Sequence, residues 1–277
     1  TMHLIYTRFF TKFMRDIGLV DFDEPMITLR NQGIILGEDS EKMSKSRGNV
    51  VAPDELVGEY GADTVRGYLM FGWRWDQGGP WDPHGIDGVY RWLHRVWSLI
   101  LEPPREETDG EPADEEIADL RRWTHRTIES VSDDMEAFAF NTIIARLMEL
   151  TNALIKAKES ALYGGEAWDE GIETLLLLMA PACPHVAEEL WSRTGRPYSI
   201  HQQAWPESIP ELTVEEIITL VVQVNGRVRA RLEVPADISE EAAKEAALAE
   251  ENVQRYTEGR QIKRVIYVPG RLVNVVV

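Results

Sequence analysis

The sequence predicts a multidomain, mainly helical protein: the end of an α/β fold, then an α-helix bundle, then a small α+β domain. Three observations lead to this prediction. A basic, hydroxyl-rich loop follows a short apolar run near residue 40. Apolar residues then recur at spacings of three and four, as in packed helices. From about residue 219 the apolar period becomes two, which is typical of strands.

Composition and charge narrow the class of protein. At 277 residues, the chain can hold two or three domains with their own cores. The net charge of −18 argues against a general nucleic-acid binder, so RNA contacts would need local basic patches. The longest apolar run is far shorter than a membrane span and no basic, apolar leader is present, so we expect a cytoplasmic protein without membrane contact. The single cysteine, Cys183, is expected to be a small buried side chain.

The first 52 residues are predicted to contain helices and one short strand. Apolar residues recur on one helical face over residues 4–17, and the chain opens inside this pattern without a capping run, so we expect a fragment of a longer protein. Pro25 is expected to open a short helix that ends at Gly33. Residues 34–36 are expected to form a brief strand that leads into the basic loop.

The basic loop reads Lys-Met-Ser-Lys-Ser-Arg-Gly-Asn over residues 42–49, and we call it the phosphate loop. Two ammonium groups, a guanidinium, two hydroxyls and a carboxamide suit a mobile loop that closes over a polyphosphate, because each lysine can present a charge to a phosphate oxygen. Gly48 lets the backbone turn or approach a ligand closely. A solvated basic turn without any partner would have the same composition.

The order of these residues matches the signature loop of class I aminoacyl-tRNA synthetases letter for letter. The flanking residues 32–37, 49–53 and 60–66 resemble the leucyl-tRNA synthetases and their valyl and isoleucyl relatives. The resemblance implies that residues 1–52 are the C-terminal end of the catalytic, nucleotide-binding α/β fold. The family's His-x-Gly-His signature occurs nowhere in this sequence. We therefore expect that this chain alone does not activate leucine.

The resemblance also implies substrates, partners and site residues. The substrates would be leucine, tRNA(Leu) and ATP with Mg²⁺; this chain would hold no zinc site or other metal and would be a monomer. Lys42 and Lys45 would be catalytic, and Lys45 would stabilise the leaving pyrophosphate. The residues that the motif implies for ATP binding are Lys42, Met43, Ser44, Lys45, Ser46 and Asn49.

Residues 53–83 are predicted to form a helical junction. Pro53 suits the first turn of one helix, and a second helix is expected over residues 62–71. A Gly/Pro-rich loop with clustered indoles follows. These side chains could stack on bases, but we expect them to pack the junction between domains. They are Trp73, Trp75 and Trp81.

Residues 84–212 are predicted to form the helix bundle, with helices at 84–101, 114–132, 136–160 and, with a proline break, 168–195. In the family this bundle is the anticodon-binding domain. Its basic side chains are either tRNA contacts or ordinary solvated positions. They include Arg91, Arg95, Arg122, Arg126, Arg146, Lys156 and Lys158. His185 and the two glutamates after it allow a metal site, but a packed helix that begins at Pro184 is the preferred interpretation.

Residues 215–277 are predicted to form a small domain in the order strand, strand, helix, helix, strand, strand. Asn225 and Gly226 suit the tight turn of the first hairpin. The domain resembles the C-terminal domain of bacterial leucyl-tRNA synthetases. That feature disfavours a valyl or isoleucyl type, since valyl enzymes typically end in a coiled coil. A stand-alone tRNA- or RNA-binding protein derived from a synthetase is the other alternative, against which the intact phosphate loop argues.

Three arginines of the first hairpin, Arg227, Arg229 and Arg231, alternate with apolar residues. A period of two would place all three guanidinium groups on one face of the sheet. That face is either a charged solvent surface or a stripe that follows RNA phosphates, together with Lys263 and Arg264. The resemblance favours the second interpretation, because the family's C-terminal domain contacts the outer corner of the tRNA.

Overall fold

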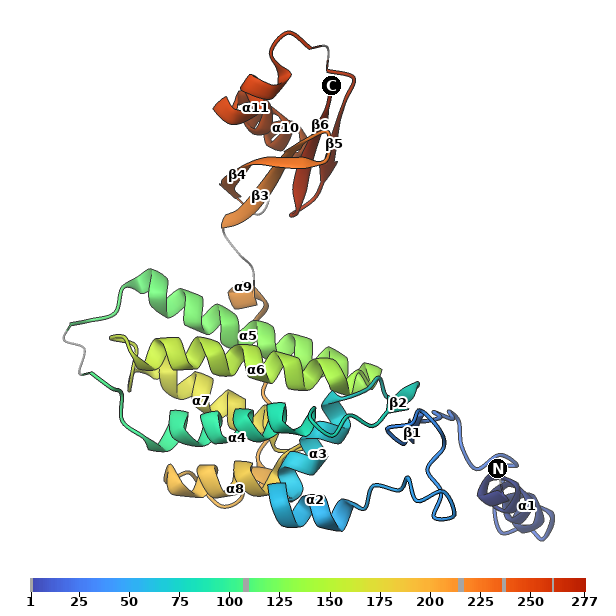
Figure 1. The fold of residues 1–277 in the computed structure, drawn as a ribbon. Helices are drawn as coiled ribbons and strands as arrows, with labels where there is room; N and C mark the ends of the chain where they lie inside the picture. The colour runs from blue at the N-terminus through green and yellow to red at the C-terminus, as the bar shows by residue number, and fades with distance from the viewer. Residues whose placement is uncertain (1, 107–109, 214–216, 236–237, 261) are drawn as a thin grey trace.

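The protein divides into an N-terminal region, a helix bundle and a C-terminal α+β domain, in chain order (Figure 1). This arrangement comes from a computed structural model that describes residues 2–106, 110–213, 217–235, 238–260 and 262–277. Each of the last two parts has its own apolar core. The predicted fold class is therefore confirmed.

The N-terminal region begins with helix α1 (Met2–Asp16), whose apolar side chains are largely exposed; Phe9, for example, is 64% exposed. The predicted helix between Pro25 and Gly33 is wrong, since this stretch forms no regular element. An isolated helix of that length is marginal unless it buries an apolar face. Here Ile27 and Leu29 remain exposed, and no such face is covered.

Strand β1 (Ile34–Leu36) holds the N-terminal region to the junction, because it pairs in parallel with β2 (Gly78–Pro80). The backbones of these two segments approach so closely that a Cβ atom on Gly33 would lie 2.1 Å from the Gly78 nitrogen. Glycine is therefore required where β1 begins. Helices α2 (Pro53–Tyr60) and α3 (Ala62–Phe71) occupy the chain between the two strands, as predicted.

The three tryptophans of the junction pack against protein side chains, which confirms the packing interpretation. Trp81 is 7% exposed and its ring centroid lies 5.1 Å from that of Tyr68. Trp73 donates from Nε1 to the Pro80 carbonyl at 3.0 Å. Trp75 reaches the bundle, where it lies edge-on to Phe140 with ring centroids 5.4 Å apart.

The bundle consists of α4 (Ile86–Leu101), α5 (Asp114–Ala137), α6 (Phe140–Lys158), α7 (Glu166–Met179) and α8 (Pro184–Arg193). The short helices η1 (Ile200–Gln202) and α9 (Pro210–Thr213) follow. The proline break falls between α7 and α8, as predicted. α5 continues past the predicted end and stops at Phe138, which has φ +59°. No glycine or proline marks that stop in the sequence.

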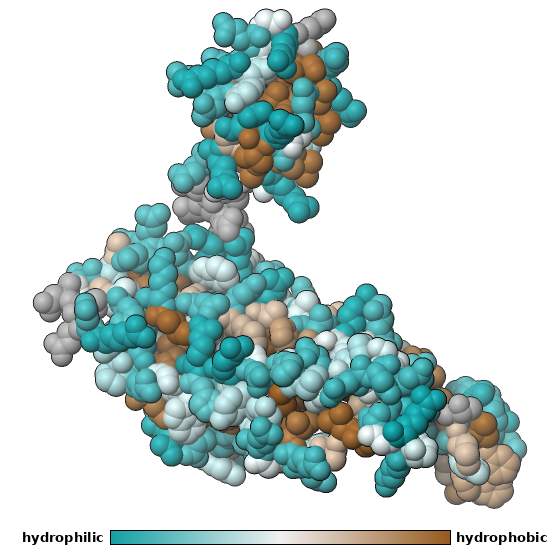
Figure 2. Space-filling view, in the orientation of Figure 1, coloured by the Kyte–Doolittle hydropathy of each residue, from teal (hydrophilic) through white to brown (hydrophobic). Residues whose placement is uncertain are grey.

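The bundle core is built from the predicted apolar faces. Leu147, Leu150 and Leu154 of α6 are fully buried, as are Leu175 and Leu176 of α7. Each such leucine contributes roughly 1.5–3 kcal/mol relative to an exposed side chain. Cys183 is also fully buried, and burial raises the pKa of its thiol. In the view of Figure 2, hydrophilic residues cover most of the bundle surface.

The C-terminal domain contains β3 (Ile217–Val224), β4 (Arg227–Pro235), α10 (Glu240–Ala249), α11 (Glu251–Thr257), β5 (Arg264–Val268) and β6 (Leu272–Val276). The sheet order is β4-β3-β6-β5, in which the central pair β3–β6 is parallel and the two hairpins are antiparallel. The turn at Asn225 (φ +49°) and Gly226 (φ +78°) confirms the predicted hairpin.

Lys158, which the sequence grouped with candidate tRNA contacts, is a structural residue. It is 6% exposed, and its Nζ donates to the carbonyl oxygens of Ser98 at 2.8 Å and Leu99 at 3.0 Å. The ammonium thereby satisfies the last carbonyl groups of α4, a position that suits a cation. Its expected surface role is therefore wrong.

We expect Lys158→Met to lower the free energy of unfolding by about 1–3 kcal/mol, because it removes the side-chain donor from the buried Leu99 carbonyl and leaves the Ser98 carbonyl with only the Glu102 amide. Urea denaturation followed by circular dichroism measures this change. The matched control is Lys156→Met on the same helix, where the lysine is exposed and little change is expected. Equal stability of the two variants would contradict the assigned role of Lys158.

Candidate functional site

Two consecutive turns shape the phosphate loop. The first is closed by hydrogen bonds from the Gly37 amide to the Glu41 carbonyl at 2.8 Å and from Ser40 to Gly37 at 2.9 Å. This turn reverses the chain, so that the backbone of Lys42 forms an isolated antiparallel β-bridge with Leu36 of β1. The second turn is closed by the Gly48 amide, which donates to the Ser44 carbonyl at 3.2 Å. The loop is thus a folded projection from the end of β1.

The carboxamide of Asn49 ties these two turns together. Its Oδ1 accepts from the Ser44 amide at 2.9 Å, and its Nδ2 donates to both carboxylate oxygens of Asp39 at 3.1 Å. Asp39 Oδ1 also accepts from the Glu41 amide at 3.1 Å. We call this pair of side chains the Asn49–Asp39 clasp. It fixes the exit of the phosphate loop to its entrance.

The clasp depends on its surroundings in two ways. Two hydrogen bonds to its charged form lower the pKa of the Asp39 carboxyl. The larger effect comes from the Glu41 amide and the smaller one from the Asn49 carboxamide. The backbone of Gly37 lies so close that a Cβ atom there would be 2.7 Å from Asp39 Oδ1 and 2.9 Å from Asn49 Nδ2. A larger residue at position 37 would push the clasp apart.

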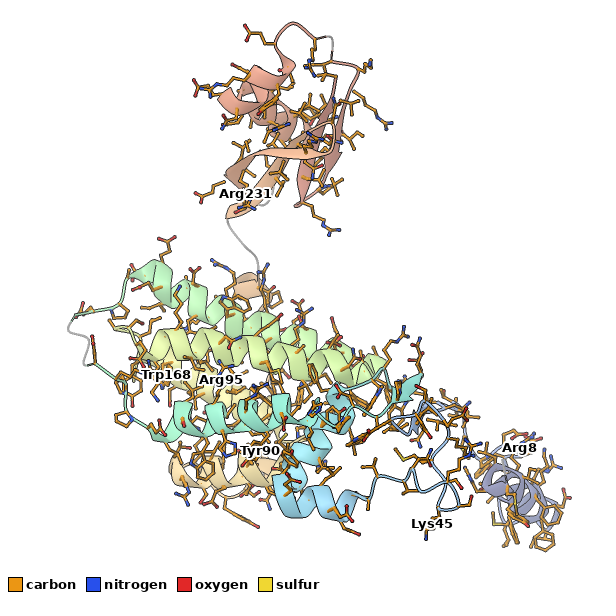
Figure 3. All side chains as sticks on the ribbon, in the orientation of Figure 1. Arg8, Lys45, Tyr90, Arg95, Trp168 and Arg231 are labelled. Atoms are coloured by element: carbon orange, nitrogen blue, oxygen red, sulfur yellow. The ribbon has the colours of Figure 1, made fainter. Side chains whose placement is uncertain are left out.

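The two lysines of the phosphate loop face solvent. Lys42 and Lys45 are both exposed, and within the described ranges neither forms an ion pair, whereas neighbouring Arg47 is paired with Glu41 at 3.1 Å. Figure 3 shows Lys45 at the edge of the molecule, directed away from the helix bundle. Two such ammonium groups on a fixed loop can receive an external anion.

The remaining loop residues support this presentation. Met43 turns its side chain toward the bundle core, where it packs with other partly buried apolar residues. This packing anchors the loop, and the predicted contact of Met43 with ATP stays a prediction. The hydroxyls of Ser44 and Ser46 lie 2.8 Å apart and are hydrogen-bonded to each other. Their contact with phosphate stays a prediction.

The expected stripe of arginines on β4 is interrupted by a β-bulge. Leading to the bulge, Val222 of β3 pairs with Ala230; beyond it, Gln223 pairs with Val228. Arg229 is thus one extra residue without a partner in the register, and the side-chain period of two fails there. Val228 is accordingly 52% exposed, although the alternation places it on the apolar face.

The bulge separates the arginines onto different faces. Arg227 pairs with buried Val224, and Arg231 pairs with Val221. Paired residues share a face of the sheet, and Val221 and Val224, three residues apart on β3, lie on opposite faces. Arg227 and Arg231 therefore lie on opposite faces as well. Arg229 stacks its guanidinium on Tyr256 of α11 at 3.6 Å from the ring centroid. The single-face arrangement predicted for all three guanidinium groups is therefore wrong.

Two further candidates lie on the same small domain. Lys263 and Arg264 are both exposed, beside the last strand, where Lys263 donates its amide to the Val276 carbonyl at 2.9 Å and Arg264 pairs with Val276. Their side chains are available to an RNA backbone. Their role in tRNA binding stays a prediction.

The basic residues of the bundle are mostly engaged with nearby groups. Arg95 donates to Asn152 at 2.5 Å, Arg146 is paired with Glu149 at 3.2 Å, and Arg122 is bonded to Asp119. Arg91 donates to a carbonyl one turn earlier, and Arg126 donates to the Thr213 carbonyl at 2.9 Å. Contacts of the exposed members of this group with tRNA stay a prediction. The structure does not gather the seven candidates into one site.

The possible metal site at the start of α8 is instead a structural contact. His185 Nδ1 lies 2.7 Å from Asp63 Oδ1, Glu188 accepts from the Ile200 amide at 3.0 Å, and Glu189 is paired with Arg193 at 2.7 Å. The described residues contain no cluster of three or more His, Cys, Asp or Glu side chains able to hold a metal ion. No described helix is both long and apolar enough to cross a membrane.

Sequence reasoning missed Asp39 and Gly37, although they position the phosphate loop. Asp followed by Ser is a common turn signal, and it could have indicated a side-chain bond to the backbone two residues later. The bond from Asn49 to Asp39, ten residues away, has no such signal. Only the fold brings these two side chains together.

Comparisons with known proteins cover the whole chain. Residues 5–74 match the family described as class I tRNA synthetases (I, L, M and V), and residues 119–244 match the anticodon-binding domain of tRNA ligase. The leucine–tRNA ligases of Dehalococcoides mccartyi and Rubrobacter xylanophilus are 51% and 53% identical to it, over 100% of this chain and 34% and 33% of theirs. The chain thus spans about one third of the length of these curated relatives.

One solved structure shares this fold over the full chain. It is described as the ternary complex of Agrobacterium radiobacter K84 agnB2 LeuRS with tRNA and LeuAMS. It is 34% identical in sequence, with a TM-score of 0.78, and the match covers 100% of this chain and 37% of that one.

We expect Asn49→Ala to loosen the phosphate loop without unfolding the protein, because the clasp lies outside the apolar cores and joins only the two turns. Hydrogen–deuterium exchange of a peptide that contains residues 42–49 should become at least about tenfold faster, corresponding to roughly 1.4 kcal/mol of lost local stability. Asn152→Ala, in the bundle, serves as the control. Unchanged exchange in Asn49→Ala would contradict the clasp.

Proposed function

We propose that this chain, as part of a member of the leucine–tRNA ligase family, supplies the phosphate loop and the tRNA-contacting domains of such an enzyme. It spans about one third of the length of the matched relatives. In the reaction, the carboxylate of leucine attacks the α-phosphate of ATP and pyrophosphate leaves. The leucyl group then passes to the 3′ end of tRNA(Leu). The observation that carries the proposal is the phosphate loop, a fixed projection whose two lysines form no ion pair within the described ranges.

The proposed chemical role of the loop is charge stabilisation. Negative charge builds up on the leaving pyrophosphate, and Lys45 would stabilise it, with Lys42 as the second cation. The hydroxyls of Ser44 and Ser46 would donate to phosphate oxygens once a ligand replaces their mutual bond. Asn49 would act by holding the loop, since its carboxamide is already bonded on both sides. The protein contributes position and charge, with no covalent step of its own.

ATP is proposed to arrive with its Mg²⁺ already bound. The described residues provide no carboxylate cluster for the ion. Magnesium is commonly held mainly by phosphate oxygens and water, so the proposal needs no protein site here. What this chain adds to the ATP complex is the pair of lysines.

The tRNA-contacting role is proposed for the rest of the chain. We assign residues 1–52 to the end of the catalytic domain, 53–83 to a helical junction, 84–212 to the anticodon-binding bundle and 215–277 to the C-terminal tRNA-contacting domain. The related Agrobacterium structure is a complex with tRNA, which supports this partner. The exposed cations of the C-terminal domain supply local positive charge on an acidic chain.

We further propose that the protein works in the cytoplasm as a monomer and that this chain alone is not catalytically competent. The phosphate loop provides only one side of a nucleotide clamp, and no His-x-Gly-His sequence is present to provide the other.

In a complete enzyme that carries this segment, Lys45→Ala should slow leucine activation by about a hundred- to thousandfold, or 2–4 kcal/mol of transition-state stabilisation. ATP–pyrophosphate exchange measures that step. Lys156→Ala, an exposed lysine of the bundle, is the control. An unchanged exchange rate in Lys45→Ala would remove the lysine from the mechanism.

Binding of this chain to a leucine-accepting tRNA should weaken as salt increases, and an Arg227/Arg229/Arg231→Glu variant should bind less tightly with a smaller salt slope. Filter binding at several salt concentrations measures both quantities. Single Arg227→Glu and Arg231→Glu variants separate the two faces of the sheet, since only a face in contact with RNA responds. Salt-independent binding would refute a phosphate-contacting role.

A further inference from the structure

A pocket of about 610 Å³ lies where the helix bundle meets the junction, and the preceding assignments give it no role. Its walls come from three segments: residues 30–31, residues 74–76 after α3, and residues 137–139 with 141–142 at the turn between α5 and α6. We call it the α5–α6 pocket. Figure 1 shows this end of α5 and α6 beside β1 and β2, between the N-terminal region and the rest of the bundle.

Positively charged side chains outnumber negatively charged ones in the lining of this pocket. Arg30 and Arg74 bring two guanidinium groups, whereas Asp76 is the single carboxylate among the lining residues. The first turn of α6 contains no acidic residue to neutralise them. Amide and hydroxyl groups complete the polar lining, from Asn31, Asn141 and Thr142. The lining therefore has a net positive charge on a chain whose total charge is −18.

Each guanidinium is held in place but keeps donors for a ligand. Arg30 donates through Nη1 to the Glu136 carbonyl at 2.9 Å and lies over the Phe138 ring at 4.1 Å from its centroid. Arg74 is bonded through Nε and Nη2 to the two oxygens of Asp76 at 3.2 and 3.1 Å. Arg30 Nε and Nη2 and Arg74 Nη1 have no acceptor among the described residues. Both side chains are exposed.

Trp75 and Phe138 give the pocket an aromatic wall, and Phe140 packs behind them. Trp75, Phe138 and Phe140 pack together with ring centroids 5.3–5.9 Å apart. Phe138 is held at φ +59°, which turns the chain sharply between the two helices. A preformed wall beneath two arginines reduces the ordering that a ligand would require.

From this arrangement we propose that the α5–α6 pocket binds the phosphodiester backbone of the tRNA through Arg30 and Arg74. Planar guanidinium groups match the geometry of phosphate oxygens, and a lining with a net positive charge favours a polyanion. The proposal rests on the proposed function, since the RNA is the tRNA of that reaction. It adds a backbone contact between the phosphate loop and the bundle, separate from the cations of the C-terminal domain.

The test measures binding of this chain to a fluorescently labelled leucine-accepting tRNA by anisotropy at several salt concentrations. Arg30→Glu and Arg74→Glu should each weaken binding about five- to tenfold and reduce the salt slope by about one. The matched control is Arg193→Glu on α8, whose side chain is 53% exposed and likewise paired with a carboxylate. That control should bind like the unmodified chain.

A second variant separates lost binding from lost folding. Asp76→Asn removes the carboxylate that holds Arg74, so it should tighten binding about two- to fivefold and steepen the salt dependence. A misfolded protein would not gain affinity. Wild-type binding with no change in any of the three pocket variants overturns the pocket alone. Failure of the unmodified chain to bind tRNA overturns both the pocket and the tRNA-contacting role.

Discussion

The attachment of the junction, which follows the phosphate loop in the chain, to the helix bundle depends on a buried carboxylate. Asp63, at the start of α3, is 5% exposed, and its two oxygens lie 2.7 Å from His185 Nδ1 and 2.6 Å from the Val186 amide at the start of α8. A buried charge is tolerated only when its hydrogen bonds are satisfied, so this contact permits little movement. Arg66 of the same helix adds bonds to the carbonyls of Pro181 and Ala182. Helix α3 of the junction is therefore tied to the bundle at the start of α8 and at the turn before it.

Electrostatic pairing distinguishes the phosphate loop from the other basic parts of the molecule. Most bundle arginines with a described contact are bonded to a nearby acid, amide or carbonyl, and such exposed pairs contribute little to stability. Lys42 and Lys45 project without a carboxylate partner among the residues that the structure describes. Two lysines without a carboxylate partner on one hydrogen-bonded loop leave their charge available to an anion. This preorganisation is useful for stabilising charge in a transition state.

Local sequence rules fail at several of the proposed contact sites. The bulge at Arg229 interrupts the alternation of β4 and directs that guanidinium onto Tyr256. The left-handed residue Phe138 ends α5 without a glycine and forms one wall of the α5–α6 pocket. Strain and irregularity of this kind persist only where the surrounding packing enforces them. A periodic pattern read along one strand or helix carries no information about that packing.

The sequence by itself determined the order of the long helices and of the elements of the C-terminal domain, the faces of the main helices, the turn at Asn225 and Gly226, and the motif of the phosphate loop. Each of these depends on residues close together in the chain. Tertiary structure alone decided the burial of Lys158, the clasp between Asn49 and Asp39, and the meeting of Arg30 with Phe138. It also decided that residues 25–33 do not form a helix. These outcomes depend on contacts between distant segments, whose free energies outweigh local preference and leave no periodic trace in the sequence.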